Sequence, residues 1–321
     1  MVHLGRSETD RRRDTTAEHR AAFERHRLEL LARHGFDAES TWFRDPAGRR
    51  TYAMTGGAGS CPKILIHGGL SESSEWWPLA GRLRGRVVVP DRPGCGLTYV
   101  PDPRRANFRR DAVAWVEHVV DALAAPHVDL IGNSMGGYFS IVFALAHPER
   151  VRRLTLVGAP AGLHRSIPLL VRLWGHPIVG RVISRRPVDD PEQLRAIFGR
   201  ILVTNADAIP REALQVMVEG AALPGVAHYA FLMLRRLTTV SGVRRDQLIT
   251  SEMPDLAVPT RFVWGEDDAF CRPGSAYDLW DRMPNADLRL VPRAGHLPQL
   301  DRPDDVAEAV SSFLDDAESP A

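Results

Sequence analysis

The sequence predicts an α/β fold with a mostly parallel, doubly wound sheet and an inserted helical cap. Short apolar segments recur along the chain, and amphipathic segments of helical period lie between them. A stretch of roughly ninety residues interrupts this alternation without a convincing strand pattern. A chain of 321 residues is long enough for one large domain with such an insertion.

The predicted sheet strands are short and mostly apolar, which is typical of strands that helices cover on both faces. A β-hairpin is expected before them, because residues 41–43 and 51–54 flank Asp45-Pro46-Ala47-Gly48, where Pro and Gly suit a turn. The strands expected after the hairpin are residues 63–66, 87–89, 128–131, 154–157, 261–264 and 288–291.

Amphipathic helices are expected between these strands. Residues 107–125 place Phe108, Trp115 and Val119 at helical spacing, and residues 304–314 have the same kind of pattern. Strands that alternate with helices in this way predict right-handed βαβ units.

The same patterns suggest the division of the chain. Residues 1–35 are expected to form an N-terminal extension, disordered to about residue 15 and then helical to Arg33. Residues 36–162 and 256–318 are expected to build the sheet domain, and residues 163–255 the helical cap.

Composition narrows the class of partner. The chain has 41 basic and 40 acidic residues, so its net charge of +1 does not suggest nucleic acid or an anionic surface, and a small-molecule substrate fits better. Three scattered cysteines form neither a disulfide framework nor a CxxC metal site, which favours the reducing cytoplasm. No apolar run is long enough to predict a membrane span.

A serine follows the predicted strand 128–131 in Gly132-Asn133-Ser134-Met135-Gly136. A strand that turns sharply into a helix needs flanking residues without bulk, and Gly132 and Gly136 meet that need. The helix that follows directs its free N–H groups and positive dipole end toward the turn. Ser134 is therefore the candidate nucleophile.

A serine hydroxyl needs a base to accept its proton and an acid to orient that base. Gly265-Glu266-Asp267-Asp268 follows the strand 261–264, and His296 follows the strand 288–291. The carboxyl ends of parallel strands share one edge of a sheet. Taken alone, the acidic segment 266–268 is more simply interpreted as an exposed turn, and His296 as an ordinary loop histidine. Together with Ser134, they favour a Ser-Asp-His triad.

The segment His67-Gly68-Gly69-Leu70 ends another predicted strand, and its small residues allow a backbone N–H to approach a substrate carbonyl. The N–H groups of Gly69 and Met135 are the candidate oxyanion hole, with Leu70 as the alternative to Gly69. His67 is interpreted as a residue that stabilises the turn.

Together these motifs resemble the α/β-hydrolase superfamily, in its capped, small-molecule branch. The resemblance covers about residues 40–315 and includes the loop 91–96, which in that family braces the active-site edge. The family's Gly-x-x-Asp pattern implies that Asp268 is the triad acid, with Asp267 as the lesser alternative.

The elbow is similar to that of meta-cleavage-product hydrolases, which cut carbon–carbon bonds in ring-fission diketones. Those enzymes usually have an arginine in the cap and a tryptophan after the catalytic histidine, where this chain has Val218 and Leu297. Without that cation, a small, mainly apolar carboxylic ester or thioester becomes the expected substrate, cleaved through an acyl-enzyme.

Carbon–carbon bond hydrolysis, cofactor-free perhydrolysis, a lyase or cyclase reaction and a non-enzymatic ligand-binding role are the alternatives. The presence of all three triad candidates argues against the last of these. No metal or organic cofactor is expected, because the proposed chemistry uses protein groups alone and the sequence has no HExxH motif.

Overall fold

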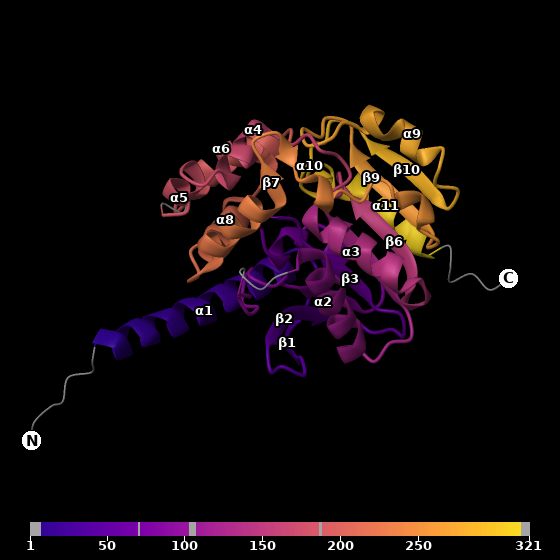
Figure 1. Ribbon diagram of the computed structural model, residues 1–321. Helices are drawn as coiled ribbons and strands as arrows, with labels where there is room; N and C mark the ends of the chain where they lie inside the picture. Colours follow the sequence, from indigo (N-terminus) through magenta and orange to yellow (C-terminus); the bar gives the residue numbers. More distant parts are fainter. Residues whose placement is uncertain (1–7, 70, 103–106, 186–187, 316–321) are drawn as a thin grey trace, which may run out of the picture.

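An eight-stranded sheet forms the centre of the molecule (Figure 1). The computed structural model describes residues 8–69, 71–102, 107–185 and 188–315. The strand order in the sheet is β1-β2-β4-β3-β5-β6-β9-β10. The strands are β1 (Glu39–Arg44), β2 (Arg50–Gly56), β3 (Lys63–Ile66), β4 (Val87–Pro90), β5 (Val128–Asn133), β6 (Val151–Val157), β9 (Thr260–Gly265) and β10 (Ala286–Val291).

The sheet is mostly parallel, as the sequence predicts. Strand β2 is antiparallel to both of its neighbours, β1 and β4, and the other adjacent strands run parallel. The expected hairpin joins β1 and β2, and its turn closes through a hydrogen bond of 2.8 Å from Gly48 N–H to the Asp45 carbonyl. Gly48 has φ 79°, a left-handed conformation that glycine adopts without a steric penalty.

Both faces of the central strands are buried. Along β3, Ile64 and Ile66 belong to one apolar cluster and Leu65 to the other, because successive strand residues point to opposite faces. Helices supply the rest of both clusters, which explains why the strands read as continuous apolar runs. The helices that pack on the sheet include α1 (Glu8–Arg33), α2 (Phe108–Ala122), α3 (Met135–Ala146), α9 (Tyr277–Trp280), α10 (Pro298–Asp301) and α11 (Pro303–Asp315).

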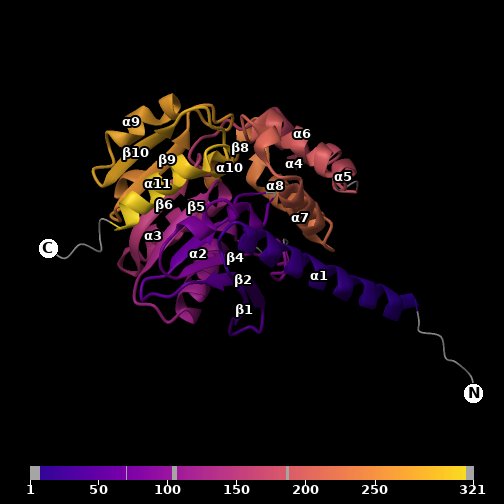
Figure 2. The same ribbon diagram turned by 180° about the vertical axis from the view of Figure 1, so that it is seen from behind.

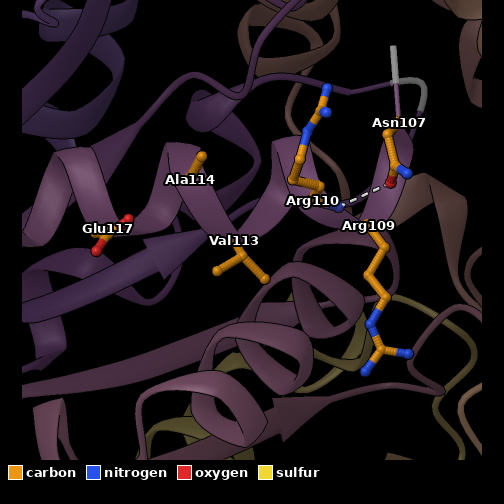
Figure 3. A pocket seen from close by; sticks show the side chains of 6 residues that line it. All are labelled: Asn107, Arg109, Arg110, Val113, Ala114 and Glu117. Atoms are coloured by element: carbon orange, nitrogen blue, oxygen red, sulfur yellow. Dashed lines mark hydrogen bonds between the residues drawn. The ribbon is translucent and has the colours of Figure 1, made fainter.

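Helix α2 begins where the sequence predicts. The side chain of Asn107 accepts a hydrogen bond of 3.1 Å from Arg110 N–H and so caps the helix (Figure 3). Ala124 has φ 51°, which ends the helix earlier than the expected residue 125. Trp115 fixes the helix on the sheet, because its indole is buried and donates to the Thr51 hydroxyl at 3.2 Å.

The segment between β6 and β9 contains α4 (Leu169–Gly175), α5 (Val179–Ile183), α6 (Pro191–Ile201), α7 (Arg211–Ala221) and α8 (Val226–Leu237). Figures 1 and 2 show these helices grouped beside the sheet domain. The expectation that this segment has no strand is wrong. Strands β7 (Thr238–Thr239) and β8 (Gly242–Val243) form a small antiparallel pair, which is too short to leave a pattern in the sequence.

Helix α1 also differs from expectation, because it begins at Glu8 rather than near residue 16. Its sequence contains neither Gly nor Pro and many good helix formers, which outweigh its low hydrophobicity. Residues 1–7 lie outside the described part of the chain. No single described helix has the length and apolar content to cross a bilayer, and α7 and α8 reach that content only as a pair bent by 80°.

A buried arginine attaches α1 to the sheet domain. Arg27 is fully buried, and its Nη1 donates to Asp91 Oδ2 at 2.8 Å and to Glu72 Oε2 at 3.2 Å. Its guanidinium also lies over the rings of Phe23 and Tyr52, 4.4 and 4.2 Å from their centroids. The pKa of Arg27 is raised, because these carboxylates outweigh the cost of burial. Arg27 therefore pairs with two buried carboxyl groups.

We expect Arg27→Met to lower the free energy of unfolding by about 3–5 kcal/mol, because it leaves Asp91 and Glu72 buried without their cation. Urea denaturation at neutral pH would measure the loss. Arg25→Met is the matched control, since the Arg25 side chain is 61% exposed on the same helix. Equal effects of the two substitutions would show that the buried network contributes nothing specific.

Candidate active site

The carboxyl ends of five adjacent parallel strands, β3, β5, β6, β9 and β10, lie at one edge of the sheet. In the observed register Ile66 pairs with Gly132, Asn133 with Val157, Val157 with Val263, and Gly265 with Val291. The segments that follow β3, β5, β9 and β10 carry Gly69, Ser134, Asp268 and His296. The register therefore brings the residues singled out in the sequence to the same edge.

Ser134 occupies a strained turn between β5 and α3. Its φ of 48° and ψ of −108° are rarely adopted by a residue with a side chain. Its carbonyl accepts hydrogen bonds from Tyr138 N–H at 3.0 Å and from Ala161 N–H at 2.9 Å, which hold the turn in place. A Cβ on Gly136 would clash with the Ile66 carbonyl oxygen. The serine is partly exposed, as a nucleophile requires.

His296 and Asp268 form a buried pair. The imidazole Nδ1 lies 2.9 Å from Asp268 Oδ2 and 3.0 Å from Oδ1. Burial raises the pKa of Asp268, but the nearby His296 and the hydrogen bonds from His296, Ala159 N–H and Phe270 N–H lower it more, so the net shift is downward. Asp268 is thus suited to stay ionised and orient the ring, whereas Asp267 is exposed.

The histidine loop is tied directly to the elbow. Asn133, which precedes the serine, donates through its amide to the His296 carbonyl at 3.1 Å and to the Val157 carbonyl at 2.8 Å. Among the described residues, His296 Nε2 has no hydrogen-bond partner although it is buried. The ring nitrogen that would accept a proton from Ser134 is therefore not engaged by another described group.

The sequence analysis did not identify Phe270 as part of this site. Its ring stacks on the His296 imidazole, with centroids 3.9 Å apart and planes 19° apart. Its N–H donates to Asp268 Oδ1 at 2.8 Å. Phe270 therefore restrains both members of the pair, and only its position two residues after Asp268 could have suggested this.

The candidate oxyanion groups lie close together. A Cβ on Gly69 would be 3.9 Å from the Met135 Cβ, so the two backbones adjoin at the start of α3. Leu70, the alternative donor, lies outside the described residues. Helix α3 begins at Met135, and its unpaired N–H groups and positive end favour negative charge at this position.

His67 has the structural role that its position suggests. Its Nε2 accepts a hydrogen bond of 2.9 Å from Arg92 N–H, and its Nδ1 lies 3.0 Å from the Gly68 carbonyl. Burial, followed by the charge of Arg92, holds the pKa of His67 well below its ordinary value. A neutral ring with Nδ1 as donor and Nε2 as acceptor satisfies both contacts, so His67 stabilises the loop.

Glu75 is a second residue that sequence reasoning missed. It lies in the turn Ser73–Trp76, and its Oε1 accepts a hydrogen bond of 2.7 Å from Gly68 N–H. Its Oε2 is buried and has no partner among the described residues. Burial raises the pKa of Glu75 to about 7, although hydrogen bonds from Ser71 and Gly68 and the charge of Arg92 oppose the shift. Glu75 thus anchors the loop beside Gly69.

The hollow in Figure 3 is lined by residues of α2 and its cap, where Asn107 is the helix cap and Arg109 is ion-paired with Glu252. No group of three or more His, Cys, Asp or Glu residues in the described segments could hold a metal ion.

Comparison with known proteins identifies the family. The model of the alpha/beta hydrolase family matches residues 64–309. The chain belongs to this family. It is accordingly a serine hydrolase with the α/β-hydrolase fold, and the resemblance seen in its motifs is confirmed.

Relatives of this alpha/beta hydrolase include enzymes of meta-cleavage type. The chain is 31% identical to a 2-hydroxymuconate semialdehyde hydrolase of Pseudomonas sp. (strain CF600), over 86% of this chain and 94% of the relative. It is 26% identical to a 2-hydroxy-6-oxononadienedioate/2-hydroxy-6-oxononatrienedioate hydrolase of Burkholderia vietnamiensis, over 80% and 88% of the two chains.

A solved structure adds support for the fold alone. It is the carboxylesterase CesB from Bacillus subtilis, with a TM-score of 0.70, 24% identity and coverage of 92% of this chain and 98% of the other. The sequence relatives thus favour the carbon–carbon alternative over the ester that the sequence analysis preferred.

The raised pKa of Glu75 predicts a pH-dependent effect of Glu75→Gln. Glu75 ionises near 4.5 in the unfolded chain and near 7 in the folded one, so wild-type stability falls as pH rises through this interval. The amide of glutamine cannot ionise but keeps an acceptor for Gly68 N–H. Relative to wild type, the variant should therefore gain about 3 kcal/mol of unfolding free energy between pH 4.5 and pH 8.

Urea denaturation of both proteins across this pH range would measure the difference, in which the titration of all other groups largely cancels. A difference that stays constant with pH would show that Glu75 has no raised pKa in the folded protein.

Proposed function

We propose that the protein hydrolyses a carbon–carbon bond next to an aldehyde or ketone carbonyl, in a dicarbonyl compound of ring-fission type, through an acyl-enzyme on Ser134. The observation that most supports this proposal is the 31% identity, over 86% of this chain, to a hydrolase of 2-hydroxymuconate semialdehyde. The His296–Asp268 pair and the adjoining elbow supply the groups that such a reaction needs.

In the proposed first step, Ser134 Oγ attacks the substrate carbonyl carbon while His296 Nε2 accepts the hydroxyl proton. Asp268 holds the Nδ1–H and stabilises the imidazolium that forms. The carbonyl oxygen becomes an oxyanion and accepts hydrogen bonds from the N–H groups of Gly69 and Met135. Loss of one such donor typically costs about 3 kcal/mol of transition-state stabilisation.

Collapse of this intermediate breaks the carbon–carbon bond. The electron pair leaves with the departing carbon, where conjugation spreads the charge, and the His296 imidazolium returns its proton to that fragment. Water then gives a proton to His296 Nε2 and attacks the acyl carbon, and Ser134 Oγ leaves with the proton. The free acid and the regenerated serine complete the cycle without a cofactor.

Ester or thioester cleavage is the second candidate, and two positions favour it. Val218 and Leu297 stand where the resemblance leads one to expect an arginine and a tryptophan, and both are apolar and buried, 5% and 4% exposed. Neither can pair with a substrate carboxylate. The same three residues would expel an alcohol or thiol in place of a carbon leaving group.

We also propose a cytoplasmic location and a small-molecule substrate. The chain has only three cysteines, scattered along its length, which suits a reducing compartment. The named relatives act on small organic acids, which supports the class of substrate.

A substrate comparison tests the main proposal. We expect kcat/KM for a 2-hydroxy-6-oxo-dienoate to exceed that for short-chain and long-chain p-nitrophenyl esters, with absorbance of the dienoate and of p-nitrophenol as the readouts. Ser134→Ala should lower the preferred activity by about 10⁴-fold or more, because the nucleophile is lost. Faster turnover of the esters would replace the first candidate by the second, and full activity of the variant would exclude both.

Adjacent carboxylates allow a matched test of the triad acid. Asp268→Asn should lower kcat by about 10⁴-fold, because the amide would favour the wrong imidazole tautomer. Asp267→Asn, one residue away and exposed, should leave kcat at the wild-type level. The reverse order of effects in steady-state assays would assign the role to Asp267.

A further inference from the structure

Exposed apolar side chains are concentrated on one part of the cap. Ten large apolar side chains are exposed in the described residues, and seven of them come from α4, α5 and the turn between β7 and β8. We call these seven the cap apolar face: Leu169, Leu170, Leu173, Ile178, Val179, Val182 and Val240. Such a concentration marks an interaction surface more often than chance exposure does.

The opposite sides of these two helices are already packed. Val171 and Gly175 of α4 are buried, and a Cβ on Gly175 would lie 3.2 Å from the Leu234 carbonyl oxygen of α8. Gly180 of α5 is buried in the same way, since a Cβ there would lie 2.5 Å from the Phe231 ring of α8. The cap apolar face is therefore the outward side of a layer whose inward side rests on α8.

The face forms one unit with the β7–β8 turn. Helix α4 contacts α5, α8 and β7. Arg172 Nη1 of α4 also donates to the carbonyl of Val240, at 3.3 Å. In Figures 1 and 2, α5 lies at the outer end of the cap, away from the sheet. The described part of the chain leaves the seven side chains of the cap apolar face exposed.

The segments that carry this face are rich in arginine, although Asp189, Asp190 and Asp246 directly follow them and Asp246 pairs with Arg244. Residues 162–188 and 226–245 together contain nine arginines and neither Asp nor Glu. The whole chain has a net charge of only +1, so its remainder is acidic. The near-zero net charge of the whole chain therefore hides two strongly cationic segments. Arg181 of α5 and Arg185, two residues after that helix, are exposed, and so is Arg235 of α8.

This charge argues against a second copy of the chain as the partner. A symmetric dimer through this face would bring the same arginine-rich surface against itself, and like charges would repel across the contact. An anionic partner with an apolar interior matches both features. Arginine side chains can extend from an apolar surface to reach anionic headgroups while Leu, Ile and Val enter the layer beneath.

We propose that the cap apolar face and its arginines bind the surface of an anionic phospholipid bilayer, with α4 and α5 lying in the headgroup region. The protein would be peripheral, held by shallow insertion of short helices. This inference does not depend on the reaction proposed above, because it concerns binding and not turnover.

Sedimentation with vesicles tests the proposal on the full chain. We expect the protein to bind vesicles of equal parts phosphatidylglycerol and phosphatidylcholine, to bind poorly to phosphatidylcholine alone, and to lose affinity as salt is raised. Arg181→Ala with Arg185→Ala should weaken binding roughly thirtyfold, on the contribution expected for two cations near an anionic surface. Ile178→Ser with Val182→Ser should weaken it at least about tenfold.

Arg289→Ala with Leu290→Ser is the matched control, since both residues are exposed on β10, far along the chain from the cap. This control should bind as wild type does. Equal binding to neutral vesicles, no binding to anionic ones, or equal loss in the control would overturn the proposal. Light scattering would also measure the oligomeric state. If the wild-type protein is a dimer and Ile178→Ser with Val182→Ser dissociates it, the face binds a second copy of the chain instead.

Discussion

The close approach of α3 to the ends of β3 and β5 is the constraint on which the active-site edge depends. A Cβ on Gly132 would lie 2.6 Å from the Gly136 backbone, and a Cβ on Gly136 would lie 2.7 Å from the His67 carbonyl oxygen. Only bare backbone fits there. This contact places the first turn of α3 beside Gly69 and forces Ser134 into its positive φ. The hydrogen bond from Asn133 then attaches the His296 loop to the same point.

The sequence predicted those features of the fold and the site that depend on local residue patterns or on the order of motifs along the chain. Central strands such as β3 and β9 are covered on both faces, so their apolar runs are continuous and their positions could be predicted within a few residues. The elbow glycines mark a steric requirement that is local to the turn. Because parallel strands end at a common edge, the order of Ser134, Asp268 and His296 was enough to predict that their loops would meet there.

The features that were missed depend on contacts between distant segments. Arg27 reads as one more charged residue on a polar helix, and only the fold brings Asp91, 64 residues away, against it. Glu75 gains its raised pKa from burial beside Gly68, which no local pattern reveals. The overall charge balance likewise says nothing about the segregation of arginine in the cap. Val218 and Leu297 show how local residues can mislead. Because they differ from the arginine and tryptophan usual in meta-cleavage-product hydrolases, they pointed to an ester, whereas similarity along most of the chain favours cleavage of a carbon–carbon bond.

Helix α1 lies upstream of the family match, which begins at residue 64, but it contacts both the loop after β4 and helix α7. Its Arg27 reaches Asp91 beneath the sheet edge, and its His26 lies 2.8 Å from Glu219 of α7. A shortened protein that starts at the first strand would retain every catalytic candidate. It would also keep two carboxylates, those of Glu72 and Asp91, facing each other without a counter-ion beside the glycine loop. The segment that the family model matches is thus shorter than the segment over which these buried charges interact.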